Sequence, residues 1–423
     1  MPRTVIAAAL VFLAACEPVP QDPVRVRALV LSGNGSYVTQ EVTLTTITDI
    51  IRMEGDVAKL VGGARIVLDS ADPELQVPSL TEESFANALI KSEGRPVTAS
   101  WIEQDGVLWP ADFHTWNLVT AYYNFEKARE YFNTVGNIPL ADFGGPATVY
   151  YFADFTLKDS NPEPIKDNAL WFAPTQSFMV VPFDELQRAP LAINSGIMSH
   201  EYSHMVFNRK VYGSRRLPPP ITDWGAQGTS PGANLIKALD EGLADYHGYG
   251  VTCKSATGCD PRFLRTSFDD KLSNDRDLSK ADRCVDIGLR NALLQTGLSS
   301  FSGQGLEYKL GAILASALYQ AGESTGQREV LMRAVVSAYS DETANNPGLK
   351  QLISLVGNDQ GSFNLTSVSA VLINHVTDVP LKTALCNELI DHLQVPAADL
   401  VGPGKPCPAA AQGGTTCTRL PPP

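Results

Sequence analysis

Five consecutive residues, His200-Glu201-Tyr202-Ser203-His204, have the types and the spacing that bind a divalent metal ion. Residues four apart on a helix lie one turn apart on the same face, so the two imidazoles can coordinate one Zn²⁺ at about 2.0–2.1 Å each. Glu201 would project beside the metal, where a carboxylate can take a proton from water and pass it to a leaving amine. The pattern therefore indicates metal-assisted hydrolysis.

A catalytic zinc site of this type needs a third protein ligand and leaves the fourth position to water. The segment Asp240-Glu241-Gly242-Leu243-Ala244-Asp245 offers one, because Glu241 and Asp245 share a face of the next predicted helix. We predict that Glu241 completes the site and that Asp245 accepts the free ring N–H of a ligand histidine, which fixes its tautomer. The sequence thus predicts one Zn²⁺ per chain, bound by His200, His204 and Glu241. The alternative is two solvated helix faces with ordinary charges.

The two motifs resemble those of the gluzincin metallopeptidases, specifically the thermolysin-like and fungalysin-like branches, over about residues 110–340. The resemblance implies an α+β, two-lobed zincin fold. A mixed sheet with the active-site helix would form the upper lobe, a helical lobe would follow, and zinc would lie in the cleft between them. Such an enzyme hydrolyses peptide bonds, so a peptide or protein is the expected substrate.

Two weaker correspondences concern substrate binding. Asp167-Asn168-Ala169-Leu170-Trp171 is similar to the edge strand of these enzymes, which implies that Asn168 and the backbone of Ala169 pair with an extended peptide. Leu264-Arg265-Thr266 is similar to the segment whose arginine holds a substrate carbonyl, which implies that role for Arg265.

A third correspondence predicts the group that stabilises the oxyanion. Gly305 to Gly311 resembles the start of the helix that carries a histidine in the family, but no histidine is present there. A tyrosine phenol can donate to the same oxyanion, so we predict that Tyr308 replaces the imidazole. Tyr246 and Tyr249 are the alternatives.

Hydrophobic periodicity predicts the elements that must position these residues. Apolar residues recur at helical spacing in six segments, one of which contains the HExxH motif. Five other segments have the pattern of strands. The predicted strands are residues 24–27, 41–45, 147–152, 168–172 and 178–181, and the predicted helices are residues 114–132, 197–208, 233–246, 310–321, 330–339 and 380–393.

These elements suggest a division of the chain. We expect a small, separate β-rich N-terminal domain over residues 25–106, the upper zincin lobe over 107–250, a helical lower lobe over 251–400 and a Pro/Gly-rich tail over 401–423. By its position alone, the N-terminal domain is also a candidate inhibitory pro-segment.

The first residues resemble a bacterial export signal. Arg3 and a short apolar run precede Leu13-Ala14-Ala15-Cys16, a lipobox-like sequence, so we expect a signal peptide over 1–15, lipidation of Cys16 and a Pro-rich tether over 16–24. This predicts a lipid-anchored protein of the bacterial cell envelope, at the outer membrane or cell surface. An ordinary secretory signal is the alternative.

The other six cysteines are an even number, which favours three disulfides in an exported chain. Short loops favour Cys253 with Cys259 and Cys407 with Cys417, leaving Cys284 for Cys386. A thiolate metal site is the alternative, although no C-x-x-C spacing occurs.

Composition excludes other functions. The 423-residue chain has a net charge of -13, which argues against an extended nucleic-acid surface, and no apolar run reaches the roughly 20 residues of a membrane-spanning helix. The acidic loop from Asp269 to Asp282 offers oxygen ligands for Ca²⁺ but lacks EF-hand spacing, so we expect a solvated loop. We predict a zinc endopeptidase. The alternative is an inactive, zinc-stabilised scaffold that binds a surface protein or polymer, and the oligomeric state stays open.

Overall fold

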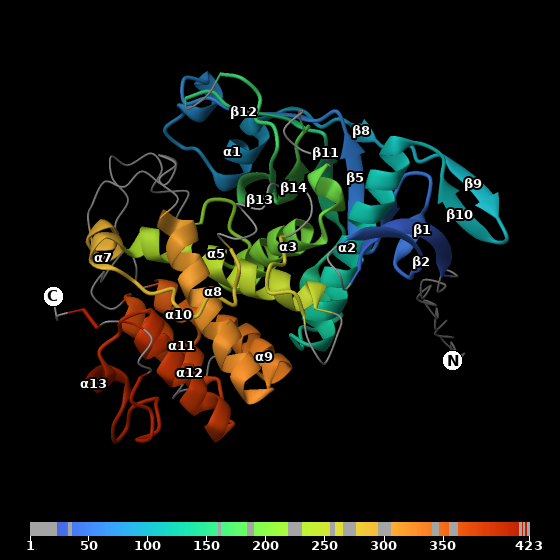
Figure 1. Ribbon diagram of the computed structural model, residues 1–423. Helices are drawn as coiled ribbons and strands as arrows, with labels where there is room; N and C mark the ends of the chain where they lie inside the picture. Colours follow the sequence, from blue (N-terminus) through green and yellow to red (C-terminus); the bar gives the residue numbers. More distant parts are fainter. Residues whose placement is uncertain are drawn as a thin grey trace, which may run out of the picture.

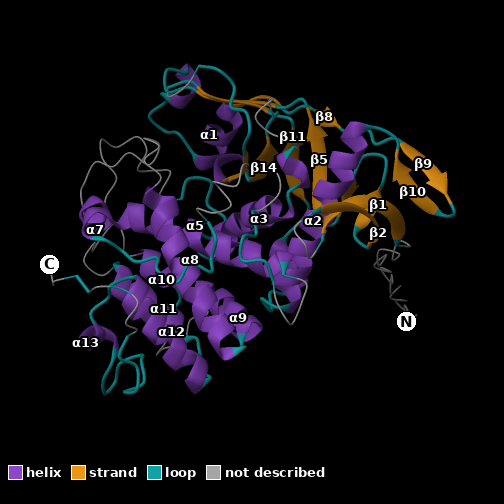
Figure 2. Cartoon of the chain, viewed as in Figure 1, coloured by secondary structure: helices purple, strands orange, loops and turns teal. Residues whose placement is uncertain are grey.

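The strands and the later helices occupy different parts of the molecule. The computed structural model describes residues 23–32, 36–159, 162–183, 190–218, 231–253, 259–264, 276–294, 306–340, 347–354, 363–413, 417 and 419–420. Figure 1 shows the strands in the upper part of the molecule and the helices from α9 to α13 in the lower part, with α8 between them, and Figure 2 shows the same division by element type. The structure is a mixed α+β fold with a β-rich N-terminal region and a helical C-terminal lobe, which confirms the predicted fold class.

The described strands form three sheets. One has the order β2-β1-β10-β9, a second has the order β13-β14-β11-β5-β4-β3 with β8 also paired to β5, and a third has the order β12-β6-β7. Parallel pairs join β1 to β10, β5 and β14 to β11, and β6 to β12, so the sheets are mixed. The strands are β1 (Val24–Leu31), β2 (Tyr37–Leu44), β3 (Ile47–Asp49), β4 (Glu54–Gly55), β5 (Ala58–Gly62), β6 (Arg65–Leu68), β7 (Ile90–Ser92), β8 (Arg95–Pro96), β9 (Trp101–Gln104), β10 (Val107–Pro110), β11 (Ala147–Tyr151), β12 (Asp154–Leu157), β13 (Ala169–Phe172) and β14 (Ser177–Val180).

Helices α1 (Glu82–Leu89), α2 (Phe113–Thr134) and α3 (Ser195–Lys210) accompany the sheets. Asp112 caps α2 by accepting from the Thr115 N–H, and Asn194 caps α3 by accepting from the Ile197 N–H. The α2 carboxylate Glu126 is buried and accepts from the backbone N–H and hydroxyl groups of both Thr45 and Thr46. These bonds join α2 to the turn between β2 and β3.

The lower half is helical, and α3, α5 and α8 pack in sequence to join it to the sheets. The remaining helices are α5 (Pro231–Thr252), α7 (Ile287–Leu294), α8 (Leu306–Thr325), α9 (Arg328–Ser340), α10 (Leu349–Ser354), α11 (Leu365–Asn374), α12 (Val379–His392) and α13 (Ala397–Leu400). The short 3₁₀ helices are Pro73–Leu75, Leu140–Phe143, Ala173–Thr175 and Leu191–Ile193. None of the helices in the described ranges has the length and apolar character needed to cross a membrane.

The strand pairing corrects the predicted boundary at residue 106. Strand β5, which lies before this boundary, pairs along its length with β11, which lies after it, and β1 pairs with β10. One hydrophobic core also contains residues from both sides. Alternating strands are visible in sequence, but their partners are not, so the sequence alone could not show that the N-terminal strands complete the main sheet.

The disulfides correct the predicted pairing in part. Cys253 pairs with Cys259 as predicted, whereas Cys284 pairs with Cys417 and Cys386 with Cys407. Short loops are entropically cheap to close, but the fold places Cys407 beside Cys386 on α12 and so overrides that preference. The two bonds also fasten the predicted tail to the helical lobe.

Candidate metal and catalytic site

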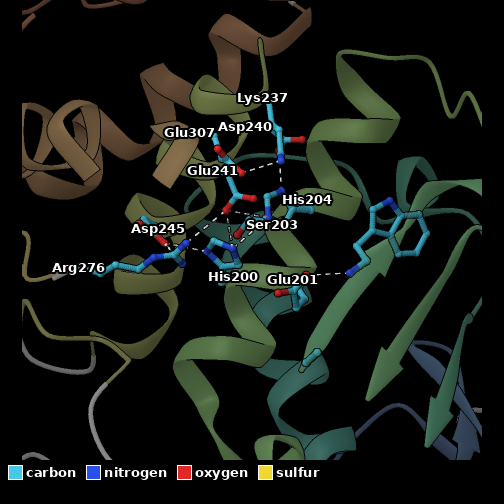
Figure 3. Close-up of polar contacts among 12 residues, drawn as sticks. His200, Glu201, Ser203, His204, Lys237, Asp240, Glu241, Asp245, Arg276 and Glu307 are labelled. Carbon is cyan, nitrogen blue, oxygen red and sulfur yellow. Dashed lines mark hydrogen bonds and ion pairs between the residues drawn. The ribbon is translucent and has the colours of Figure 1, made fainter. Parts of the chain in front are cut away.

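Two adjacent helices carry the predicted metal ligands. His200 and His204 lie one turn apart on α3, and Glu241 lies on α5, which packs against α3. All three side chains are largely buried, and Figure 3 shows them pointing toward one another. The sequence placed these residues on helices, and the structure brings them together.

The three ligand atoms have the separation that a tetrahedral zinc ion requires. His200 Nε2 lies 3.0 Å from His204 Nε2 and 3.3 Å from Glu241 Oε2, and His204 Nε2 lies 3.7 Å from Glu241 Oε2. Ligand atoms of a tetrahedral zinc with bonds of about 2.0–2.1 Å lie about 3.3–3.4 Å apart, and a point equidistant from these three atoms is about 2 Å from each. The geometry therefore fits one zinc ion.

The oxygen atom at one corner of this triangle supports the same conclusion. Glu241 Oε2 is buried and accepts no hydrogen bond from the described residues. The Arg276 guanidinium lies 3.5 Å from this oxygen and offsets part of its charge, and a cation between the three ligand atoms would give the oxygen the direct partner that it lacks. The ligand atoms of His200, His204 and Glu241 also lie close enough together, all within 4.8 Å of one another, to hold one metal ion.

A carboxylate faces the other nitrogen of each histidine. His200 Nδ1 lies 2.9 Å from Asp245 Oδ1, and His204 Nδ1 lies 2.7 Å from Asp240 Oδ1. The His204–Asp240 contact is a hydrogen bond, whereas the His200–Asp245 contact has the distance of an ion pair but not the geometry of a hydrogen bond. A proton on Nδ1 beside a carboxylate leaves the Nε2 lone pair free to bind metal. Asp245 thus lies beside His200, and Asp240 makes a hydrogen-bonded contact with His204 that the sequence prediction did not include.

The carboxylates of the site favour a positive charge between the three ligand atoms. Burial alone would lower the pKa of His204, but the contact with Asp240 and the nearby Glu241 outweigh it and hold that pKa well above its usual value. Burial alone would raise the pKa of Glu241, but the two imidazoles outweigh it and hold that pKa well below its usual range. Metal binding displaces such protons, because the ligands must be deprotonated.

Glu201 lies beside the triangle, where the edge strand holds it. Its Oε2 accepts from the backbone N–H of Trp171 on β13 at 2.8 Å, and burial raises its pKa above the usual value. A carboxyl group with a raised pKa, held in one orientation, suits exchange of a proton with a bound substrate.

The same hydrogen bond defines the free edge of β13. The Trp171 N–H points away from β14, and alternate residues of a strand point the same way, so the Ala169 carbonyl also faces the outer edge. No described strand pairs with that edge. The Ala169 N–H, however, is taken by the Asn168 side chain at 2.9 Å.

A large cavity opens over these groups. Its volume is about 1030 Å³, and it extends from β13 across the triangle to α8 and to the segment around Cys284. Phe155, Leu157, Ile165 and Leu170 give it an apolar wall. The cavity is large enough for several residues of an extended peptide.

The remaining predicted residues have different outcomes. Tyr308 lies in the first turn of α8, lines the cavity and is 43% exposed. Tyr246 and Tyr249 are buried and do not line the cavity, and Tyr249 donates to Glu323 instead. Tyr308 is therefore the candidate donor of the three. Arg265, Cys16 and the Asp269–Asp275 part of the acidic loop lie outside the described residues.

Arg276 is a site residue that the sequence did not reveal. Its Nη1 lies 3.0 Å from Asp245 Oδ1, its Nη2 lies 3.5 Å from Glu241 Oε2, and its guanidinium carbon lies 4.5 Å from the centre of the Tyr308 ring. It belongs to no motif and follows Asp245 by 31 positions, so no spacing signal could have identified it.

The similarity to known proteins is found in solved structures. No family model and no curated protein matches the chain. Among solved structures, the precursor of protealysin, a metalloproteinase from Serratia proteamaculans, aligns with a TM-score of 0.43 and 14% sequence identity. The alignment covers 77% of this chain and 86% of that one.

Proposed function

We propose that the protein is a zinc-dependent endopeptidase. The observation that carries this proposal is the triangle of His200 Nε2, His204 Nε2 and Glu241 Oε2, which fits zinc and lies beside a buried glutamate in a cavity. Zinc bound there would act as a Lewis acid on a substrate carbonyl and on a water molecule.

The residues around the triangle have complementary roles in this proposal. Asp245 and Asp240 hold the two imidazoles in the tautomer that binds metal. Glu201 takes a proton from water and returns it to the nitrogen of the leaving amine, and the Trp171 N–H keeps its carboxylate in place. The Tyr308 phenol donates a hydrogen bond to the carbonyl oxygen as negative charge develops on it.

The substrate would bind as an extended peptide along the outer edge of β13. The Ala169 carbonyl would accept a hydrogen bond from the peptide backbone, and the Asn168 side chain would provide the polar group next to it. Because backbone groups make these contacts, the edge recognises a peptide without selecting its sequence. The carbonyl-binding arginine proposed from the sequence is Arg265.

Glu201→Gln is the direct test. The variant keeps the size of the side chain but loses the base, so we expect zinc content to stay at one ion per chain while hydrolysis of an unfolded protein substrate disappears. Glu307→Gln is a matched control, because Glu307 lines the same cavity but contacts Lys237. Full activity of Glu201→Gln would contradict the mechanism. Zinc without hydrolysis in the wild type would instead support the inactive scaffold.

We further propose that the protein is exported and lipid-anchored through Cys16. The lipobox-like sequence supports this proposal. Metabolic labelling with a radiolabelled fatty acid should mark the wild type and not Cys16→Ser, and equal labelling of both would contradict it.

A further inference from the structure

Arg276 contacts the metal-ligand region and the proposed oxyanion donor with different parts of one group. Two of its guanidinium nitrogens lie 3.0 Å from Asp245 and 3.5 Å from Glu241, while its central carbon lies over the Tyr308 ring, 4.5 Å from the ring centre. Its side chain is only 11% exposed, so the surrounding protein restricts it to this arrangement. Figure 3 shows Arg276 entering the site beside Asp245 and His200.

Tyr308 needs such a contact if it is to act at a fixed position. It lies in the first turn of α8 and is 43% exposed, so less of its surface is packed than for a core tyrosine. A phenol that moves over the cavity would lose much of its value as a donor, because electrostatic catalysis depends on groups that are held in place before the reaction. A cation against the ring face attracts it and restricts that motion.

We propose, on the basis of the proposed function, that Arg276 is a positioning residue that fixes the Tyr308 phenol relative to the metal ligands. Asp245 and Glu241 hold the guanidinium plane, and the plane in turn holds the aromatic ring. The ligand set on α3 and α5 and the donor on α8 are thereby linked through one side chain.

Arginine suits this role better than lysine. A guanidinium is planar and can use its N–H edge for two carboxylates while its face stacks on an aromatic ring. An ammonium is a compact charge without a flat face, so it can neutralise the carboxylates but cannot stack. Arg276→Lys therefore removes the planar group over the Tyr308 ring and retains the charge, which also preserves the balance of the buried carboxylates.

A double-mutant cycle tests the proposal in kinetics. All proteins are assayed with saturating zinc, so that loss of metal does not contribute. Tyr308→Phe should lower kcat about 100-fold to 1000-fold. Arg276→Lys should lower kcat at least tenfold. The kcat of the double variant should lie within about threefold of the kcat of Tyr308→Phe, because Arg276 acts through the phenol that Tyr308→Phe already removes. Independent, multiplicative losses would overturn the proposal.

A spectroscopic measurement tests the contact without catalysis. The zinc-free protein is labelled with fluorotyrosine, and the Tyr308 ¹⁹F signal is identified by its absence in Tyr308→Phe. We expect this signal to move in Arg276→Lys and to stay in Lys309→Met. Lys309 is a matched control, because it follows Tyr308 on α8 and lines the cavity but pairs with Asp286 at the surface.

The two measurements separate this proposal from the proposed function. A wild-type protein that hydrolyses no peptide would contradict the function, while the ¹⁹F signal would still decide whether Arg276 fixes Tyr308. A Tyr308 signal that is the same in wild type and Arg276→Lys, with both proteins folded by thermal melting, would overturn the positioning role.

Discussion

Gly242 and Gly311 lie in direct backbone contact where α5 and α8 cross. A Cβ atom on Gly242 would meet the Gly311 carbonyl oxygen at 2.5 Å, and a Cβ on Gly311 would meet the Gly242 nitrogen at 2.8 Å. Glu241 is adjacent to one glycine in sequence, and Tyr308 precedes the other by one helical turn. The close approach of the two glycines therefore sets the distance between a metal ligand and the proposed oxyanion donor.

Gly311→Ala should separate the two helices. The added methyl group meets backbone atoms that cannot rotate away, and overpacking of this kind costs about 1–3 kcal/mol in unfolding free energy, partly offset by the higher helix propensity of alanine. We expect a lower melting temperature and a kcat reduced about tenfold or more, with zinc still bound. Thermal unfolding and steady-state kinetics on the zinc-loaded protein measure both effects.

Gly145→Ala is the matched control for this change. Apart from Gly145 itself and its two chain neighbours, no described residue has an atom within 4 Å of a Cβ built on Gly145. Its stability and activity should stay near those of the wild type. If Gly311→Ala behaved in the same way, the close packing of α5 and α8 would have no role in the site.

Asp240 should contribute to zinc affinity through His204. Asp240→Asn keeps an acceptor for the His204 N–H but removes the charge, and changes of this kind cost about 10-fold to 100-fold in metal affinity. We expect Asp240→Asn near the lower value and Asp240→Leu near the upper one, measured by competition with a chelator. Glu307→Gln removes a cavity carboxylate that contacts Lys237 and should leave zinc affinity unchanged. Equal affinities in all four proteins would show that the 2.7 Å contact does not support the ligand.

The helices of the site were predictable from sequence because each pattern is local. His200 and His204 specify one helical face within five residues, and Glu241 and Asp245 do the same on the next helix. The predicted segments 197–208 and 233–246 lie within α3 and α5 of the structure. Helical spacing and the demands of zinc coordination were sufficient for these elements.

Other features depend on contacts between distant segments. The pairing of β5 with β11 and of Cys284 with Cys417 joins residues far apart in the chain, and no local pattern encodes either partner. Arg276 reaches the site from outside every motif. The edge position of Ala169 was predictable only in part. A family resemblance suggested it, but the order of strands in the sheet is needed to show that β13 lies at one end of that sheet.

The disulfides should stabilise the fold in the order of the loops they close. Cys284 and Cys417 are 133 positions apart, and Cys386 and Cys407 are 21 apart. Loop-closure entropy then gives losses of about 5 kcal/mol for Cys284→Ser with Cys417→Ser and about 3 kcal/mol for the other pair. Urea unfolding of the two double variants measures the difference. A larger loss for the shorter loop would mean that contacts in the native state, and not chain entropy, decide these values.

Cys284 lies beside the cavity, which adds a functional expectation. The segment that contains it is also held by a backbone hydrogen bond from Val285 to His392 at 2.8 Å. Without the Cys284–Cys417 bond, this backbone hydrogen bond would still hold the segment, but less tightly than the two together. We therefore expect KM to rise more than kcat falls, because the cavity wall that contacts substrate becomes looser while the metal ligands stay in place. The Cys386–Cys407 variant should not change KM, since those cysteines line no part of the cavity given by the described residues.

His247 should make the fold sensitive to acid. It is fully buried on α5, its Nδ1 lies 2.8 Å from the Tyr131 hydroxyl, and the rings of Phe132 and Tyr339 pack against it. Burial lowers its pKa from 6.5 to about 3. The folded protein therefore keeps a neutral imidazole while the unfolded chain binds a proton below pH 6.5, so stability is full above that pH and declines as the pH falls toward 3.

The expected loss from this group is about 2 kcal/mol between pH 6.5 and pH 4.5. The glutamine side chain of His247→Gln cannot take up the proton. The unfolding free energy of His247→Gln should therefore fall by about 2 kcal/mol less than that of the wild type between pH 6.5 and pH 4.5. Urea unfolding of the zinc-free proteins at both pH values measures the change without a contribution from metal release. Tyr131→Phe is the control, because it removes the hydrogen-bond partner but keeps the imidazole, and it should retain the wild-type pH dependence. If the unfolding free energies of wild type and His247→Gln changed equally with pH, His247 would take up its proton in the folded protein. The Phe132 and Tyr339 rings packed against it would then have to move apart in acid.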